Sequence, residues 1–157
     1  MPITYVSGDP MLTGAQVLAF SHNARGRAEL GDLHTRLMRA YPAAFSMYRR
    51  HTRKKFSKTG SYWLWRESKP ALMFMIVRDS AVGATRLRYV QAAAIELARS
   101  YRLEGIQSVA ITPLGQSHEW DEIKLILNQW LAPAKLHVVV YDAVQPGVKA
   151  DEDESTG

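Results

Sequence analysis

Residues 17–32 read VLAFSHNARGRAELGD, in which an apolar run opens into a glycine-bearing loop that leads into a helix. A second stretch of the same design, residues 109–116 with the sequence VAITPLGQ, leaves another apolar run and enters another helix. A loop between a strand and the first turn of a helix presents backbone N–H groups, together with the positive end of the helix, to a phosphate. Two such loops in one small domain predict a ligand that carries a pyrophosphate.

Short apolar runs alternate with helical spacing along the rest of the chain. Strands are expected at about residues 3–7, 15–20, 61–66, 71–77, 106–111 and 136–141. Helices are expected at about residues 30–51, 84–101 and 117–131, with Pro42 dividing the first into two. Helices between strands require crossover connections, so the pattern predicts an α/β fold, a three-layer α/β/α sandwich with a mixed, mostly parallel sheet of about six strands. In such a sheet the ligand binds beyond the carboxyl ends of the strands, where both glycine-bearing loops are expected.

Length and composition set the class of protein. The 157 residues fit one domain, which we expect at residues 1–143, followed at 144–157 by an acidic tail that is predicted to be disordered. The absence of cysteine excludes disulfides and thiolate chemistry, and no His or carboxylate cluster has metal-ligand spacing, so neither a metal nor a cofactor is expected. The sequence begins without a secretory signal and has no apolar run near the ~18 residues that span a bilayer, so we expect a soluble, cytoplasmic protein without a membrane partner.

Positive charge gathers in one stretch of a chain whose net charge is +5. Residues 49–58 read RRHTRKKFSK, and their basic side chains are Arg49, Arg50, Arg53, Lys54, Lys55 and Lys58. Such a patch attracts polyanions through the release of counterions, which favours a nucleic-acid partner. The alternative is a solvated helix end without a partner. Trp63 and Trp65 share one strand face near Phe56, where they either stack bases of a single strand or, as we favour, pack against a helix.

Seven short segments, in their order and spacing, carry a resemblance to a known family. They are residues 5–9 (YVSGD), 16–23 (QVLAFSHN), 40–42 (AYP), 85–90 (TRLRYV), 105–111 (GIQSVAI), 113–115 (PLG) and 120–123 (WDEI). Over about residues 3–143 the chain resembles a macro domain, the module that recognises ADP-ribose. It looks most like the branch that contains the antitoxin reversing DNA ADP-ribosylation and the related hydrolases for ADP-ribosyl-glutamate. The resemblance implies that ADP-ribose, or a macromolecule carrying it, is the partner.

The resemblance assigns roles to residues at two strand ends. Asp9 resembles the carboxylate that accepts a hydrogen bond from the adenine amino group, and a turn residue or helix cap is the alternative reading. His22 and Asn23 stand where the family holds a side chain that faces the distal ribose. A loop Asn with only a turn role is equally consistent with that position.

The two glycine-bearing loops carry the residues that would hold the diphosphate. Gly31 and the run Leu114-Gly115-Gln116 stand where the family brings its backbone close to the phosphates. Both loops have fewer glycines than the family pattern, and Asp32 adds a negative charge, which is unfavourable beside a pyrophosphate. A poorer phosphate cradle is therefore expected. A domain that only binds its ligand, or one repurposed for nucleic-acid binding or assembly through residues 49–58, is the alternative to a hydrolase.

Catalytic candidates follow from the same resemblance. Arg78 stands where the DNA-directed branch holds a central Lys after its fourth strand, and the adjacent Asp79 is its expected partner. An Arg stays protonated at neutral pH, so Arg78 would stabilise developing negative charge or clamp a phosphate rather than move a proton. Asp32 is the candidate for acid/base chemistry, with His34 and His118 as alternatives. If the domain is an enzyme, the implied reaction is hydrolysis of the bond between ADP-ribose and its acceptor.

Overall fold

The computed structural model describes residues 3–153 of the chain. These residues form a sheet of six strands, β1 (Thr4–Gly8), β2 (Val17–Asn23), β3 (Tyr62–Trp65), β4 (Ala71–Arg78), β5 (Ser108–Ile111) and β6 (His137–Val144). The helices are α1 (Asp32–Ala40), α2 (Pro42–Lys54), α3 (Leu87–Ser100) and α4 (Ser117–Leu131), with a short 3₁₀-helix at Pro10–Leu12. Of the helices in this described part of the chain, none is both long and apolar enough for a membrane crossing.

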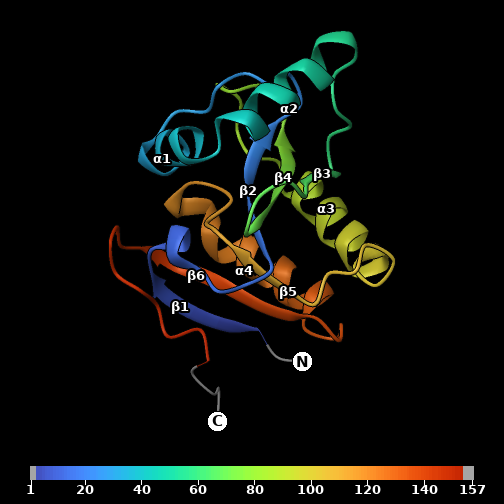
Figure 1. Cartoon of the computed structure of the whole chain (residues 1–157). Coiled ribbons are helices and arrows are strands. Elements are labelled where there is room, and N and C mark those ends of the chain that lie inside the picture. The colour runs from blue at the N-terminus through green and yellow to red at the C-terminus, as the bar shows by residue number, and fades with distance from the viewer. Residues whose placement is uncertain (1–2, 154–157) are drawn as a thin grey trace.

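The strands follow the order β1-β6-β5-β2-β4-β3 across the sheet, with β1 and β3 at its two edges (Figure 1). Every neighbouring pair is parallel except β3 with β4, which form the expected hairpin. Parallel neighbours joined through helices have their carboxyl ends at the same edge of the sheet. Because β2 lies between β4 and β5, the loops that follow these three strands meet at one place.

Alternation along the central strands divides the core into two layers. In β2, Val17 and Ala19 belong to the core beneath α3 and α4, while Leu18 and Phe20 belong to the core beneath α1 and α2. Helices therefore cover both faces of the sheet, and the predicted three-layer α/β/α sandwich is confirmed (Figure 1). Because β2 is buried on both faces, its sequence is a continuous apolar run rather than an alternating one.

Most element boundaries follow the expected ones, and the exceptions have local causes. Pro42 separates α1 from α2 as predicted, because a proline fits the first turn of a helix but not its interior. The helix α3 begins three residues later than expected, since Arg86 is extended and its N–H donates to the carbonyl of Val77 (3.0 Å). The helix α4 begins where expected, and Gln116 and Glu119 close its first turn as a capping box.

The chain beyond β6 returns across the carboxyl end of β1. The N–H of Gly147 donates to the carboxylate of Asp9 (2.8 Å), and Glu152 accepts a hydrogen bond from the hydroxyl of Tyr141. This segment belongs to the acidic tail, residues 144–157, for which the sequence predicts disorder. Its described part makes these contacts with the domain, and the rest of it lies outside the described residues.

Candidate functional site

A cleft of about 470 Å³ opens at the edge of the sheet where β2, β4 and β5 end. Its walls are the ends of these strands, the loops that follow them and the start of α1, and its polar residues include Ser21, Glu29, His34, Arg78 and Gln116. A hollow of this size accommodates a ligand as large as a nucleotide. In the part of the chain that the structure describes, no group of three His, Asp or Glu side chains is arranged to hold a metal ion.

Hydrogen bonds tie the loops around this cleft to one another. The N–H of Ala24, just after β2, donates to the carbonyl of Arg78 at the end of β4 (3.0 Å). The hydroxyl of Thr85, in the loop after β4, donates to the carbonyl of Leu114 in the loop after β5 (3.0 Å). The three loops are therefore held as one unit, and the two glycine-bearing stretches meet at one site as their pattern predicts.

An ion pair between Arg78 of β4 and Glu29 of the loop after β2 forms part of the cleft wall. The two side chains are only 12% and 4% exposed. Arg78 also donates to the hydroxyls of Ser21 (3.1 Å) and Thr85 (2.8 Å), and Glu29 accepts from the amide of Asn23 (2.6 Å). A buried charge is tolerated only when it is paired and hydrogen-bonded, so each member of the pair depends on the other.

His34 of α1 supplies a neutral imidazole beside this ion pair. Its Nε2 lies 2.7 Å from the carbonyl oxygen of Ser21, which only accepts hydrogen bonds, so Nε2 carries the proton. Burial is the main cause that lowers the pKa of His34; the bond to Ser21 and the carboxylate of Glu29 act in the opposite sense, and Arg78 lowers the pKa further. With Nε2–H engaged, Nδ1 is the nitrogen that is able to accept a proton.

Asp9, at the end of β1, lies in a separate polar cluster. Its carboxylate is contacted twice by Arg36 of α1 (3.0 and 3.1 Å) and once each by the N–H groups of Gly147 (2.8 Å) and Met11 (3.0 Å). Burial on its own raises the pKa of Asp9, but these N–H groups and the guanidinium outweigh it, and the pKa is lowered. All four lone-pair sites of the carboxylate are occupied, and the bond from Met11 gives Asp9 the helix-capping role that was its alternative reading.

No protein-family model matches the sequence, and a search of curated proteins finds no match either. Solved structures do match. The macrodomain of Thermus aquaticus DarG superposes with a TM-score of 0.82 at 19% identity, over 89% of this chain and 97% of that one. The macrodomain of Mycobacterium tuberculosis DarG gives a TM-score of 0.80 at 23% identity, over 88% and 96% of the two chains. The chain has the macrodomain fold. Thermosipho africanus DarTG, solved in complex with ADP-ribose, shares this fold at a TM-score of 0.82 and 20% identity, over 95% of this chain and 43% of that one.

The fold brings part of the predicted site together on the cleft wall. The predicted residues that line the cleft are Arg78, Gly115, Gln116 and the alternative acid/base candidate His34. Leu114 is fully buried next to them, and Gly31 caps the start of α1. The side chain of Asp32 is 77% exposed and pairs with Arg36 (3.3 Å), so it lies on the outer surface of α1 and does not line the cleft.

His22 and Asn23 lie behind the wall of the cleft rather than on it. The strand β2 runs to Asn23, past the end expected near residue 20, so both residues are buried strand residues. His22 packs against the rings of Tyr48 and Phe74, with centroids 5.0 and 5.3 Å away. The Oδ1 of Asn23 accepts from the N–H groups two and four residues further along the loop (3.1 Å each), which is the turn role considered above. A contact of either residue with the distal ribose stays a prediction.

The buried His22 gives the domain a specific sensitivity to acid. Burial is the main cause that lowers the pKa of His22, from 6.5 to about 3, with a smaller contribution from His34. The unfolded chain therefore takes up this proton at a higher pH than the folded chain does, and the free energy of unfolding falls as the pH drops below about 6.5. Between about pH 7.5 and pH 5 we expect the loss from His22 to be about 2 kcal/mol.

Urea unfolding of the wild type and of His22→Gln at these two pH values measures this effect. In the wild type the N–H of Asn23 donates a hydrogen bond to Nδ1 of His22 (2.9 Å). The side-chain oxygen of Gln keeps an acceptor for this N–H. We expect the stability of His22→Gln to depend less on pH than that of the wild type, whereas the exposed His118→Gln should behave like the wild type. An equal pH dependence in all three proteins would contradict the prediction.

The partner of Arg78 beside the cleft differs from the expected one. Asp79 does not pair with Arg78; it is exposed, and its carboxylate accepts from the hydroxyl of Tyr89 (3.2 Å). Glu29 pairs with Arg78 instead, because the loop after β2 folds back over the strand ends. The sequence does not identify Glu29 as the partner of Arg78. A charged residue in a loop belongs to no regular spacing, so its partner is known only once the path of the loop is known.

The basic stretch 49–58 divides between two further hollows of the domain, both outside the cleft. Arg49 and Arg53 line the first, together with residues of the loop after β2. Lys55 and Lys58 line the second. Arg50 and Lys54 are exposed and line neither of these two hollows. A nucleic-acid partner for residues 49–58 stays a prediction.

Proposed function

We propose that this macrodomain binds ADP-ribose, free or attached to a macromolecule, in the cleft at the ends of β2, β4 and β5. The observation that carries the proposal is the meeting of two strand–loop–helix junctions at one cleft of about 470 Å³. A solved structure that shares this fold, Thermosipho africanus DarTG, is in complex with ADP-ribose. The cytoplasmic location expected from the sequence is part of the same proposal.

The diphosphate would lie against the start of α4. Gly115 and Gln116 line the cleft immediately before this 15-residue helix, whose N–H groups and dipole favour an anion. A larger residue than Gly115 would disturb this turn, because an added Cβ would lie 2.7 Å from Cδ1 of the buried Ile123. The N–H of Gln116 already donates to Glu119 (2.9 Å), so this phosphate site is weaker than a fully open helix end. Arg78 supplies a further positive group on the same wall.

The adenine would lie toward β1, where the carboxylate of Asp9 would accept a hydrogen bond from its amino group. One of the present donors to Asp9 must then be exchanged. The N–H of Gly147 is the donor whose loss disturbs the domain least, because Gly147 lies in the exposed segment after β6. In this proposal Asn23 acts from behind the cleft, since its amide holds Glu29 on the cleft wall (2.6 Å).

Beyond binding, we propose that the domain hydrolyses the bond between ADP-ribose and its acceptor. Water adds to the anomeric carbon of the ribose and loses a proton to a base on the cleft wall, the bond to the acceptor breaks, and the base passes that proton on to the departing acceptor. Arg78 stabilises the negative charge of the phosphates and the leaving group, and Nδ1 of His34 or the carboxylate of Glu29 receives the proton of the water. Asp32, the acid/base candidate of the sequence, is less suitable because its side chain is 77% exposed and does not line the cleft.

Calorimetry with ADP-ribose tests the binding proposal. We expect one saturable site in the wild type and binding at least about tenfold weaker in Val82→Glu, because a carboxylate at the rim repels a diphosphate. Val82 lines the cleft and is 90% exposed, so the substitution leaves the core intact. Leu103→Glu is the matched control, since Leu103 is also 90% exposed but lies in the loop after α3. No heat at millimolar ADP-ribose, or equal weakening in both variants, would reject the site.

Release of ADP-ribose from modified DNA and from modified protein separates a hydrolase from a domain that only binds. The hydrolase proposal expects release by the wild type and slower release by Glu29→Gln/Arg78→Met, which removes the cation without leaving the buried carboxylate of Glu29 unpaired. Wild-type protein that binds ADP-ribose and releases none would leave the binding function alone standing. Equal rates for the wild type and this double variant would remove Arg78 and Glu29 from the mechanism.

A further inference from the structure

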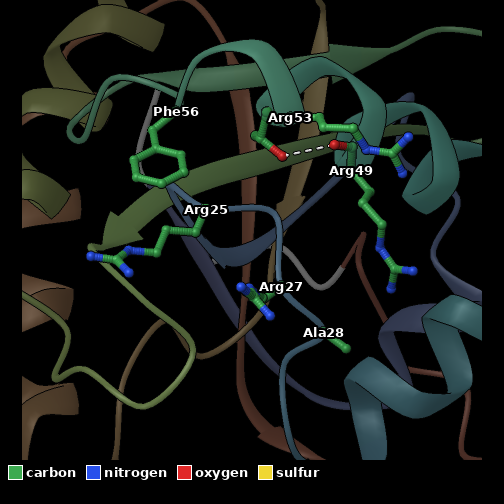
Figure 2. A pocket seen from close by; sticks show the side chains of 7 residues that line it. Arg25, Arg27, Ala28, Arg49, Arg53 and Phe56 are labelled. Carbon is green, nitrogen blue, oxygen red and sulfur yellow. Dashed lines mark hydrogen bonds between the residues drawn. The ribbon is translucent and has the colours of Figure 1, made fainter.

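A hollow of about 530 Å³ lies between the loop after β2 and the C-terminal half of α2. Its charged residues are Arg25, Arg27, Arg49 and Arg53, and we call it the arginine pocket. Figure 2 shows that these side chains come from two separate segments, Arg25 and Arg27 from the loop and the other two from the helix. The loop pair lies outside the basic stretch that the sequence singles out, so only the fold brings the four together.

The arginine pocket has no acidic partner among residues 3–153. Within residues 3–153 none of its four guanidinium groups forms an ion pair or donates a hydrogen bond, whereas Arg36, Arg66 and Arg78 each pair with an acidic side chain. Like charges gathered in one hollow repel one another and raise the local concentration of anions. The pocket therefore fits a ligand that brings several negative charges.

Hydrogen bonds to the backbone of the loop after β2 hold the arginine pocket in shape. The loop that carries Arg25 and Arg27 is closed by the side chain of Asn23, whose Oδ1 accepts from both of their N–H groups (3.1 Å each). The carbonyl of Ala24 accepts from the N–H of Ser57 beyond α2 (2.9 Å), which ties the loop to the end of the helix. Because both walls are fixed before a ligand arrives, less ordering is needed on binding.

Aromatic rings lie beside the positive charges. Phe56 is 59% exposed and lies at the mouth of the pocket, with Cζ of Arg25 at 5.2 Å from its centroid. Phe56 also lines a neighbouring hollow of about 420 Å³, together with Lys55 and Trp63. Trp63 packs against Tyr48 of α2, which confirms the expected packing role, yet it still lines this hollow. Exposed rings among cations suit unstacked bases, which a single strand offers and a duplex does not.

We infer that the arginine pocket binds the phosphodiester backbone of a single-stranded nucleic acid, with a base stacked on Phe56. This site is separate from the cleft, although the two are lined by the consecutive residues Ala28 and Glu29. The inference does not rest on the proposed binding of ADP-ribose. It goes beyond the basic stretch of the sequence, because half of its arginines and its concave shape come from the loop after β2.

Fluorescence anisotropy with an unmodified single-stranded oligonucleotide of about ten nucleotides tests the site on the full chain. The variant is Arg25→Ala/Arg53→Ala, and the matched control is Arg99→Ala/Arg102→Ala, which removes the same charge from a hollow beside α3 and α4. We expect the pocket variant to bind about tenfold more weakly, and its slope of log affinity against log salt to shrink by about 0.7 for each phosphate that it no longer neutralises. The control should change little. Phe56→Leu should also weaken binding by about tenfold, because a base can no longer stack on the ring.

Parallel titrations identify the class of ligand and the separateness of the site. The proposal is supported if single-stranded DNA or single-stranded RNA binds more tightly than both a duplex and a multiply phosphorylated peptide. The affinities of the two single strands then show whether deoxyribose or ribose is preferred. Undetectable binding at low salt, equal weakening in pocket variant and control, or tighter binding of the duplex or peptide would overturn it. ADP-ribose calorimetry on the pocket variant should match the wild type. Weaker ADP-ribose binding there would show that cleft and pocket are one site and would reject a separate one.

Discussion

Arg78→Met is expected to lower the free energy of unfolding by about 3 to 5 kcal/mol, because it leaves the buried carboxylate of Glu29 without its cation. The side chain of Glu29 is 4% exposed. Among the described side chains, it would keep one hydrogen-bond donor, the neutral amide of Asn23. Met is similar to Arg in length, so the effect reports charge rather than a cavity. Urea unfolding of wild type and variant at neutral pH measures it.

The double variant Glu29→Gln/Arg78→Met is the control for this prediction. Gln retains an oxygen that accepts from Asn23 but carries no charge, so most of the stability missing in Arg78→Met should return. Additive destabilisation in the double variant would mean that the two residues are not coupled, and the ion pair would then not be the organising contact of the cleft. The double variant is also the suitable protein in which to ask whether ADP-ribose needs Arg78.

Gly26→Ala is expected to lower the free energy of unfolding by about 3 kcal/mol, from backbone strain and overpacking together. Gly26 has a φ of +71°, and a Cβ added there would lie 2.1 Å from Oγ1 of Thr52 in α2. Thr52 is 1% exposed and its hydroxyl donates to carbonyls of its own helix, so it has no free space to move into. This glycine lets the loop between cleft and arginine pocket lie directly on α2.

Gly105→Ala separates the two causes. Gly105 has nearly the same φ, +72°, but a Cβ there would meet nothing within 4 Å. Its substitution should therefore cost only the strain of a left-handed conformation, about 1 kcal/mol. Thermal or urea unfolding of both variants gives the difference, and equal destabilisation would show that the contact with Thr52 does not matter.

The order of elements could be predicted because periodicity and breakers agree along most of the chain. The apolar run of β2 and the break at Pro42 have direct physical causes, burial on both faces in the first case and a missing N–H in the second. The place of the cleft followed as well, since parallel strands joined through helices end at one edge. No long-range contact had to be known for either result.

The side chains of the cleft were harder to predict because they depend on the path of a loop. The polar run Ser21-His22-Asn23 suggests a loop, yet it forms the end of β2, where each side chain finds a partner inside the domain. The pairing of Arg78 with Glu29 rather than with Asp79 crosses 49 residues of sequence, and no spacing rule reports it. The arginine pocket is of the same kind, since its two halves come from different elements.

A crystal structure of the protein grown with ADP-ribose shows whether the diphosphate lies in the cleft at the ends of β2, β4 and β5. We predict density for the diphosphate between the loop after β4 and the backbone at Gly115 and Gln116, with the adenine directed toward β1 and Asp9. Density in the arginine pocket with an empty cleft would contradict the account, and so would a cleft that stays closed by its own side chains at saturating ligand.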